Sequence, residues 1–261
     1  MIDSVVLCGG HGTRLYPKTR TLPKALVPIG ERPILDWVLG HLVGQGVPRI
    51  VLCTGVRASN IRDHVRSLSV TSMVQIDTQT FRSHVSGPDG SVVELLVCDT
   101  GVDTPTGARL HQVDRHLRGE GLVTYSDVLA DVSIPDLVEA HRAANAAATL
   151  TLTRVRSPFG HVDTSDAGRV LAFDEKPWLA QPINIGFMVL GTAARQRLSA
   201  TSQQLEEELL PGLASEGNLA SYVHHGRFHS MDTLADQQRL DALWRAGSLQ
   251  WLRSPVTGQP Q

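Results

Sequence analysis

The segment SVVLCGGHGTR, residues 4–14, joins a short apolar run to a glycine-rich turn. A continuous apolar run of this length is typical of a strand buried on both faces of a parallel sheet. Such strands end at the edge of the sheet where α/β proteins bind their ligands. Glycines in the turn let backbone N–H groups approach a phosphate closely. The segment therefore predicts an α/β fold with an anion-binding turn after its first strand.

The flanking sequence alternates between helix and strand. Apolar residues recur at helical spacing over 34–45 and stop at Gly46, and a strand is predicted at 49–53. Further helices are predicted at 59–66, 133–147, 203–213 and 235–244, and further strands at 73–76, 92–97, 121–125, 149–155, 169–173 and 185–190. Residues 77–107 are otherwise expected to form loops around the strand at 92–97.

This alternation across the first 155 residues predicts a doubly wound, mainly parallel sheet of the Rossmann-like kind. We expect one α/β domain at 1–235 and a short C-terminal helical extension at 236–261.

The composition narrows the possible environments and partners. A chain of 261 residues with 41% hydrophobic content can bury a full core. Its formal charge of −2 gives no general attraction to polyanions, and no Lys/Arg run marks a basic patch. No stretch approaches the roughly 20 apolar residues that span a bilayer, and the N-terminus lacks the pattern of a secretion signal. We expect a cytoplasmic protein that binds neither nucleic acid nor membranes.

The three cysteines are Cys8, Cys53 and Cys98, and each lies inside an apolar run. They are too far apart in the sequence for the close pairs of a metal site, and disulfides are rare in the cytosol. We interpret them as small buried strand residues.

Lysine is scarce, since only Lys18, Lys24 and Lys176 occur among 24 basic residues. A lysine in a chain that otherwise uses arginine favours a position where a compact point charge is needed. Codon bias is the alternative explanation.

A longer signature continues from the glycine-rich turn. GGHGTRL at 9–15 is followed by TLPKALVP at 21–28, which sets Arg14 and Lys24 close to the glycines. The turn is not a P-loop, because no Gly-Lys-Ser/Thr follows, and Leu15 replaces the third glycine of a dinucleotide fingerprint. With this signature the sequence resembles the sugar-phosphate nucleotidyltransferase family. The resemblance implies a triphosphate site made of Gly9, Gly10, Gly12, Thr13, Arg14 and Lys24. His11 is either a further donor in this loop or an exposed residue without a role.

Later motifs appear in the order that this family shows, and they look most like its glucose-1-phosphate cytidylyltransferase branch. They are VCDTG at 97–101, TGARL at 106–110, EKP at 175–177, INIGF at 183–187 and SMDTL at 230–234. The resemblance adds Thr106, Gly107 and Arg109 to the nucleotide site. It places the sugar and its phosphate on Gly160, Glu175, Lys176, Asn184 and Gly186.

Two carboxylates are candidates for a metal site. Asp127 follows the strand predicted at 121–125, and Asp232 precedes the C-terminal helix. Aspartates brought together from distant sequence can hold a magnesium ion that bridges phosphates, and the resemblance supports this pairing. Alone, either residue could be a turn former or a helix cap. We expect Mg²⁺ as the cofactor and Arg14, Lys24 and Asp127 as the catalytic residues.

One departure from the family pattern concerns the same strand end. The family usually has Gly-Asp-Gly where this chain has Ser126-Asp127-Val128. Two added side chains are expected either to narrow the ligand pocket or to impair the site.

The function implied is Mg²⁺-dependent transfer of a nucleotidyl group from a nucleoside triphosphate to a sugar 1-phosphate. The motifs favour CTP and glucose 1-phosphate, although Thr21–Lys24 is closer to guanylyl- and thymidylyltransferases. Two alternatives stay open: a catalytically dead relative that binds the same ligands, and a metal-dependent glycosyltransferase. Small-molecule substrates are the expected partners, and we also expect a homo-oligomer.

Overall fold

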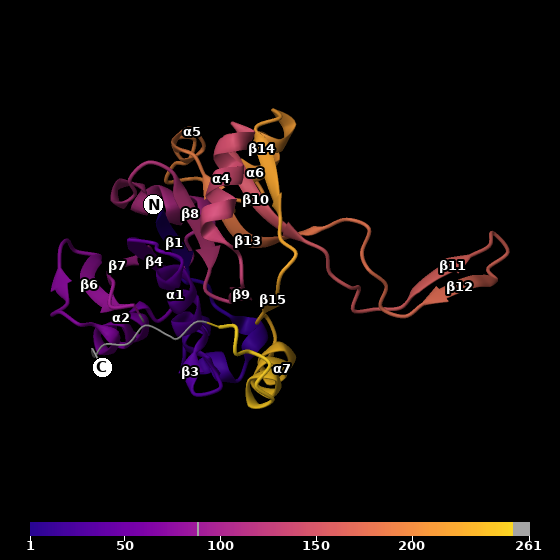
Figure 1. Cartoon of the computed structure of the whole chain (residues 1–261), viewed down its shortest axis with the longest axis horizontal. Helices are drawn as coiled ribbons and strands as arrows, with labels where there is room; N and C mark the ends of the chain where they lie inside the picture. The colour runs from indigo at the N-terminus through magenta and orange to yellow at the C-terminus, as the bar shows by residue number, and fades with distance from the viewer. Residues whose placement is uncertain (88, 253–261) are drawn as a thin grey trace.

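A nine-stranded sheet forms the centre of this computed structural model, which describes residues 1–87 and 89–252 (Figure 1). The strand order is β14-β10-β13-β8-β1-β4-β7-β6-β5. Its middle strands are parallel: β8 (Gly121–Tyr125), β1 (Asp3–Leu7), β4 (Arg49–Thr54) and β7 (Val92–Asp99).

Antiparallel pairs enter the sheet on both sides of this middle. The outer strands are β5 (Val74–Gln75), β6 (Thr80–Ser86), β10 (Ala148–Thr153), β13 (Ile183–Leu190) and β14 (Leu219–Val223). β13 is antiparallel to β8 and β10, and β6 is antiparallel to β5 and β7. The sheet is therefore mixed, with the predicted parallel arrangement at its centre.

Helices cover both faces of the sheet, because successive residues of the central strands point into two different cores. In β1, Val6 packs into one core and Val5 and Leu7 into the other. The first core is covered by α1 (Ile34–Gly44), α2 (Ala58–Leu68), α4 (Ile134–Ala144) and α7 (Leu234–Arg245). The second is covered by α3 (Thr106–Val113), α5 (Thr192–Arg195) and α6 (Leu209–Ser215). The doubly wound arrangement predicted from the sequence is confirmed.

Local signals explain where the best-predicted helices begin. The side chain of Ser133 accepts a hydrogen bond from the Asp136 N–H at the start of α4, with Pro135 in the first turn. Thr233 and Asp236 form a capping box at the start of α7.

The C-terminal helix α7 packs against the N-terminal part of the chain. Its Gln237 side chain donates to the Pro28 carbonyl, and Asp241 accepts from the Gly30 N–H. The ring centroids of Trp37 and Trp244 lie 4.9 Å apart. The helical part of the predicted extension is thus joined to the main core, while residues 253–261 lie outside the described residues.

Two segments differ from expectation at the same place in the fold. Residues 106 and 107, expected at the end of a loop, begin α3, and the helix predicted at 203–213 begins only at Leu209. The Gly107 N–H donates to the Gln203 carbonyl, and Thr106 Oγ1 accepts from the Leu205 N–H. These tertiary hydrogen bonds hold residues 203–205 against the start of α3 and out of a helix.

Smaller elements surround the sheet. Two-residue strands β2 (Pro28–Ile29) and β3 (Arg32–Pro33) pair, as do β9 (Val128–Ala130) and β15 (Phe228–Ser230). Single 3₁₀ turns are η1 (Thr13–Leu15), η2 (Lys18–Arg20), η3 (Lys24–Leu26) and η4 (Asp114–His116). No helix within the described residues is both long and apolar enough to cross a membrane.

A hairpin stands clear of the body at the end of two extended segments (Figure 1). It consists of β11 (His161–Thr164) and β12 (Val170–Asp174), which pair with each other. The strand predicted at 169–173 therefore exists, but it belongs to this hairpin and not to the main sheet. We call residues 154–182 the arm.

Candidate active site

A pocket of about 490 Å³ lies where β1 and β8 end, the edge predicted to bind ligands. This volume suits a small-molecule ligand. Its lining includes every residue predicted for the nucleotide and the metal except Gly107: Gly9, Gly10, Gly12, Thr13, Arg14, Lys24, Thr106, Arg109, Asp127 and Asp232. Four separate stretches of the chain thus converge on one cavity. Gly107 instead faces Gln203, whose carbonyl oxygen would lie 2.4 Å from an added Cβ.

Gly9 is needed because Arg109 passes directly beneath the glycine-rich turn. A Cβ on Gly9 would lie 2.2 Å from Nη1 of Arg109 and 2.5 Å from its Cζ. A second side chain holds the same loop at Gly12, where the Thr19 hydroxyl donates a hydrogen bond to the Gly12 carbonyl at 2.8 Å. The loop is therefore held on both sides by side chains from elsewhere in the chain.

The guanidinium of Arg109 is buried and donates four hydrogen bonds. Nη1 donates to the Thr54 carbonyl and to Thr100 Oγ1, and Nη2 donates to the carbonyls of Gly9 and Val102. Burial lowers the pKa of Arg109 from its ordinary value. In this structure Arg109 ties together the loops around the pocket, and its contact with a triphosphate stays a prediction.

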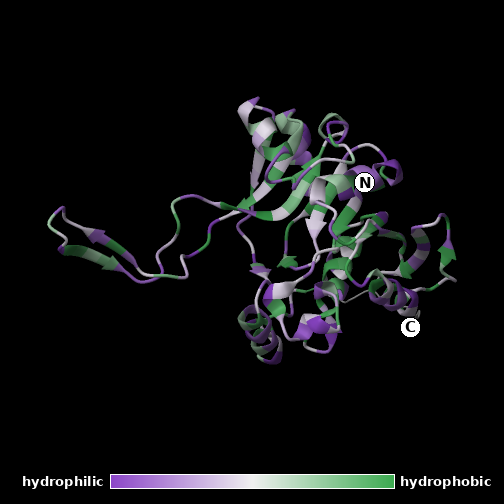
Figure 2. Cartoon of the chain, turned by 180° about the vertical axis from the view of Figure 1, so that it is seen from behind, coloured by the Kyte–Doolittle hydropathy of each residue, from purple (hydrophilic) through white to green (hydrophobic). Residues whose placement is uncertain are grey.

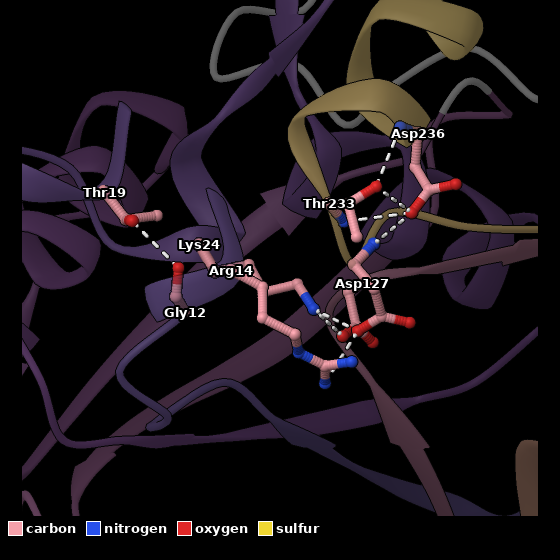
Figure 3. A network of polar contacts seen from close by, with 8 residues as sticks. Gly12, Arg14, Thr19, Lys24, Asp127, Thr233 and Asp236 are labelled. Atoms are coloured by element: carbon pink, nitrogen blue, oxygen red, sulfur yellow. Dashed lines mark hydrogen bonds and ion pairs between the residues drawn. The ribbon is translucent and has the colours of Figure 1, made fainter. Parts of the chain in front are cut away.

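Lys24 lies between the two predicted metal ligands, and Figure 3 shows its side chain beside that of Asp127. Its Nζ is 2.5 Å from Asp127 Oδ2 and 2.9 Å from Asp232 Oδ1. Arg14 Nη2 lies 3.4 Å from the same oxygen of Asp232. Two carboxylates and two cations from three distant parts of the sequence form one network.

This network fits a divalent cation. Both aspartates place an oxygen around a single point, now taken by the lysine ammonium, and carboxylate oxygens are the ligands that Mg²⁺ prefers. No group of three or more His, Cys, Asp or Glu side chains in the described residues could form a complete protein cage. Mg²⁺ is usually held by one or two carboxylates together with substrate phosphates, so Asp127 and Asp232 are sufficient.

The two residues that replace the family glycines behave differently. Val128 belongs to β9, pairs with Ser230 and packs into the first core, so its side chain does not narrow the pocket. Ser126 does line the pocket, and its N–H donates to the Leu7 carbonyl. Any effect of the departure from Gly-Asp-Gly therefore rests on Ser126.

Several lining residues were not predicted. Tyr125 forms part of the wall, and its hydroxyl donates to a carboxylate oxygen of Glu206. Burial raises the pKa of Tyr125 above its ordinary value. For His11, which was expected to be either a donor in the loop or an exposed residue without a role, the unpredicted feature is its partner: Nε2 lies 2.9 Å from Asp103 Oδ1, which links the two loops at the pocket mouth. Tyr125 could have been found from its place beside Asp127 at the strand end, but the partners on distant loops leave no local signal.

The residues predicted for the sugar phosphate lie apart from this pocket lining. Asn184 and Gly186 are on β13, where Asn184 Oδ1 accepts from the Gly186 N–H and Gly186 has φ +81° against the Tyr125 ring. Only glycine adopts this backbone conformation readily, and the absence of a side chain at Gly186 leaves room for the Tyr125 ring. Glu175 and Lys176 are on the arm, with side chains 61% and 60% exposed and 3.8 Å apart. Gly160 is also on the arm, against Phe173.

Comparisons with known proteins agree with the geometry. The profile of a family described as "Nucleotidyl transferase" matches residues 3–233. A "Glucose-1-phosphate cytidylyltransferase" of Salmonella typhi is 32% identical over 254 residues, covering 96% of this chain and 98% of that protein. A "Probable glucose-1-phosphate cytidylyltransferase" of Bacillus subtilis is also 32% identical, with 96% and 99% coverage. The crystal structure of HddC from Yersinia pseudotuberculosis superimposes with a TM-score of 0.68 at 19% identity, covering 94% of this chain and 100% of that one.

Proposed function

The chain belongs to the nucleotidyl transferase family and is a sugar-1-phosphate nucleotidyltransferase, and we propose that it transfers a cytidylyl group from CTP to glucose 1-phosphate or a close cyclic analogue. Magnesium is the proposed cofactor, and CDP-sugar and pyrophosphate are the products.

One observation carries this proposal: Lys24, Arg14, Asp127 and Asp232 meet beside the glycine-rich turn in a single pocket. Cations beside a turn of exposed backbone N–H groups suit a triphosphate. The paired carboxylates suit the cation that accompanies it. A metal-dependent glycosyltransferase would need the carboxylates but not this set of cations.

The chemistry asks for alignment and charge neutralisation and not for a general base. The attacking group is a phosphate oxygen of the sugar 1-phosphate, which is already largely ionised at pH 7. Arg14 and Lys24 would neutralise the triphosphate, and Lys176 would hold the attacking phosphate in line. Asp127 and Asp232 would hold Mg²⁺, which when bound stabilises negative charge at the reacting phosphorus. Glu175 would accept hydrogen bonds from sugar hydroxyls.

Fewer observations support the choice of base and sugar than support the reaction class. The names of the curated relatives and the motifs at 97–110 and 230–234 support CTP and glucose 1-phosphate. GTP, dTTP or UTP is the second candidate, favoured by the resemblance of Thr21–Lys24 to guanylyl- and thymidylyltransferases. A few buried hydrogen bonds decide such selectivity, each changing it by about one or two powers of ten.

A ligand-binding relative without turnover is the remaining alternative. Its motivation was the loss of two glycines around Asp127. Because Val128 points into the core, the case for it is weakened and depends on Ser126 alone.

Pyrophosphate release measured with each of four triphosphates, Mg²⁺ and glucose 1-phosphate tests the proposal. We expect CTP to lead in kcat/KM by at least about tenfold. A tenfold lead by another triphosphate would overturn the base assignment and leave the reaction class in place. Nucleotide binding without pyrophosphate from any of the four would establish the inactive alternative.

A further inference from the structure

The candidate pocket is lined by a charged group and an uncharged group of side chains. The charged group is the network of cations and carboxylates described above. The central strands are mainly hydrophobic (Figure 2), and the uncharged group comes from segments beyond their ends: Val102, Thr104, Thr106 and Gln204. Val102 is 48% exposed although it is apolar, which leaves a surface for a planar ring. A nucleoside triphosphate is divided in the same way, since its phosphates are anionic and its base is uncharged, so we expect the base beside the uncharged group.

The side chain of Gln204 is oriented by the first turn of α3. The Thr106 N–H donates to Gln204 Oε1 at 3.1 Å. The N-cap residue of α3, Pro105, supplies no side-chain cap, so Gln204 caps this helix from a distant part of the sequence. A backbone N–H can only donate, so its partner must be the amide oxygen, and this fixes which end of the amide is which. The amide nitrogen Nε2 then has no hydrogen-bond acceptor among the described residues and can donate into the pocket.

The backbone around Gln204 is held from two sides. On one side the Gly107 N–H donates to the Gln203 carbonyl at 3.0 Å, an approach so close that a Cβ on Gly107 would lie 2.4 Å from that oxygen. On the other side the Tyr125 hydroxyl donates to the carboxylate of Glu206. The Nε2 donor is therefore held in place before a ligand arrives, and little conformational entropy is lost when it binds.

A fixed donor distinguishes the bases by their ring nitrogens. The N3 atom of cytosine has a lone pair and accepts a hydrogen bond. Uracil and thymine carry a hydrogen on N3, and guanine carries one on N1, so these ring nitrogens donate. A protein donor facing this position pairs with cytosine and opposes another donor in the other three bases. An unpaired donor of this kind changes selectivity by about one or two powers of ten.

We propose that Gln204 recognises the base: its Nε2 donates to N3 of cytosine, and this contact selects CTP among the four candidate triphosphates. The inference rests on the proposed function and names the residue behind its choice of base. It also gives Gly107 a role, although Gly107 does not line the pocket. Its missing side chain lets the segment that carries Gln204 lie against α3.

Titration calorimetry with Mg²⁺ and without sugar 1-phosphate tests the contact. Gln204→Glu keeps an acceptor for the Thr106 N–H and replaces the Nε2 donor by an oxygen. The ligands are CTP and ribose 5-triphosphate, which has the triphosphate and no base. The variant should lose affinity for CTP about tenfold more than for ribose 5-triphosphate. Equal losses with both ligands would refute a contact with the base.

Gln203→Glu is the matched control, because it adds the same charge one residue away on a side chain that does not line the pocket. Its effect on the two ligands should be equal, since the added charge acts on the triphosphate that both share. A loss confined to CTP in this control would assign the effect to charge and count against Gln204.

A CTP analogue with carbon in place of N3, 3-deazacytidine triphosphate, tests the proposed acceptor. The wild type should bind it about tenfold more weakly than CTP, and Gln204→Glu should show no preference for CTP over the analogue. The same preference in both proteins would show that Gln204 does not bind N3 and would overturn the proposal.

Turnover separates failure of this inference from failure of the proposed function. In Gln204→Glu the ratio of kcat/KM for CTP to that for UTP should fall at least about tenfold, mainly through KM, because the base takes no part in the reaction. An unchanged ratio in an enzyme that prefers CTP would remove the inference and keep the proposed function. A loss of affinity specific to CTP, in a protein that releases no pyrophosphate, would keep the inference and remove the proposed function.

Discussion

Replacing Lys24 with methionine should raise the affinity of the substrate-free pocket for Mg²⁺, although it should abolish nucleotidyl transfer. The ammonium of Lys24 occupies the point on which Asp127 and Asp232 converge. A divalent cation must displace it from both carboxylates before it can bind there. Methionine keeps the length of the side chain and removes the competing charge.

The magnitude follows from how well each contact is shielded from water. Asp127 is 22% exposed, and its contact with the 16% exposed Lys24 is worth roughly 1–2 kcal/mol as a charge-assisted hydrogen bond. Asp232 is 37% exposed, so solvent screening reduces its contact to roughly 0.5 kcal/mol. Loss of both should strengthen binding of the free metal on the order of tenfold.

Mn²⁺ serves as the probe, because the electron paramagnetic resonance signal of the free ion reports its concentration directly. The titration is run without nucleotide, and Mg²⁺ competes for the same site. Lys18→Met is the matched control, because Lys18 donates to Gln237 and does not line the pocket. Its metal affinity should equal that of the wild type. An unchanged or weakened affinity in Lys24→Met would refute the reasoning that Lys24 holds the cation position.

Four further outcomes are expected. Asp127→Asn should lower kcat by about a hundredfold or more at saturating Mg²⁺ and leave the melting temperature unchanged. If the variant keeps more than about a tenth of the wild-type rate, Asp127 is not a metal ligand. Glu175→Gln should change the ratio of rates on glucose and galactose 1-phosphates more than the KM for CTP, and an unchanged ratio counts against a sugar contact. Arg109→Lys should destabilise the fold by roughly 2–4 kcal/mol in denaturant titration, because one ammonium cannot satisfy four acceptors on different loops; wild-type stability would contradict this. Burial raises the pKa of Cys8 to about 12 and of Cys98 to about 11, so both thiols stay protonated at pH 8 and iodoacetamide should leave them unmodified by mass spectrometry unless the chain is unfolded.

The parts of the fold that the sequence predicted are those with strong local signals. The apolar run at 4–8 predicts β1, and Ser133, Pro135 and the apolar spacing after them predict α4. In such segments the spacing of turn residues and apolar positions is enough to predict the structure. A strand buried on both faces and a helix buried on one face each have their own apolar pattern in the sequence. Segments fixed by distant partners were beyond this reasoning. The late start of α6 depends on hydrogen bonds to Thr106 and Gly107 that sequence spacing cannot reveal.

The candidate site divides in the same way. The glycine-rich turn, Arg14 and Lys24 are close in sequence, and the strand end at Asp127 is marked by its position, so their meeting in one pocket could be expected. The position of Lys24 between two carboxylates could not, because it depends on side-chain geometry. The projecting position of the arm could not be predicted from the sequence either. A short continuous run of apolar residues, such as that at 170–173, has the same sequence pattern inside a sheet and on a projecting hairpin.

Asp232 lies just before α7, and α7 rests on residues near Pro28 and Gly30. The glycine-rich turn and Lys24 are the first of the predicted site residues to leave the ribosome. They gain their second carboxylate only when the chain beyond residue 232 emerges. Throughout most of its synthesis a nascent chain therefore holds the glycine-rich turn without the complete network of Arg14, Lys24, Asp127 and Asp232. We expect catalytic competence to be reached in one late step, and a fragment that ends before residue 232 should keep much of the sheet without ever gaining turnover.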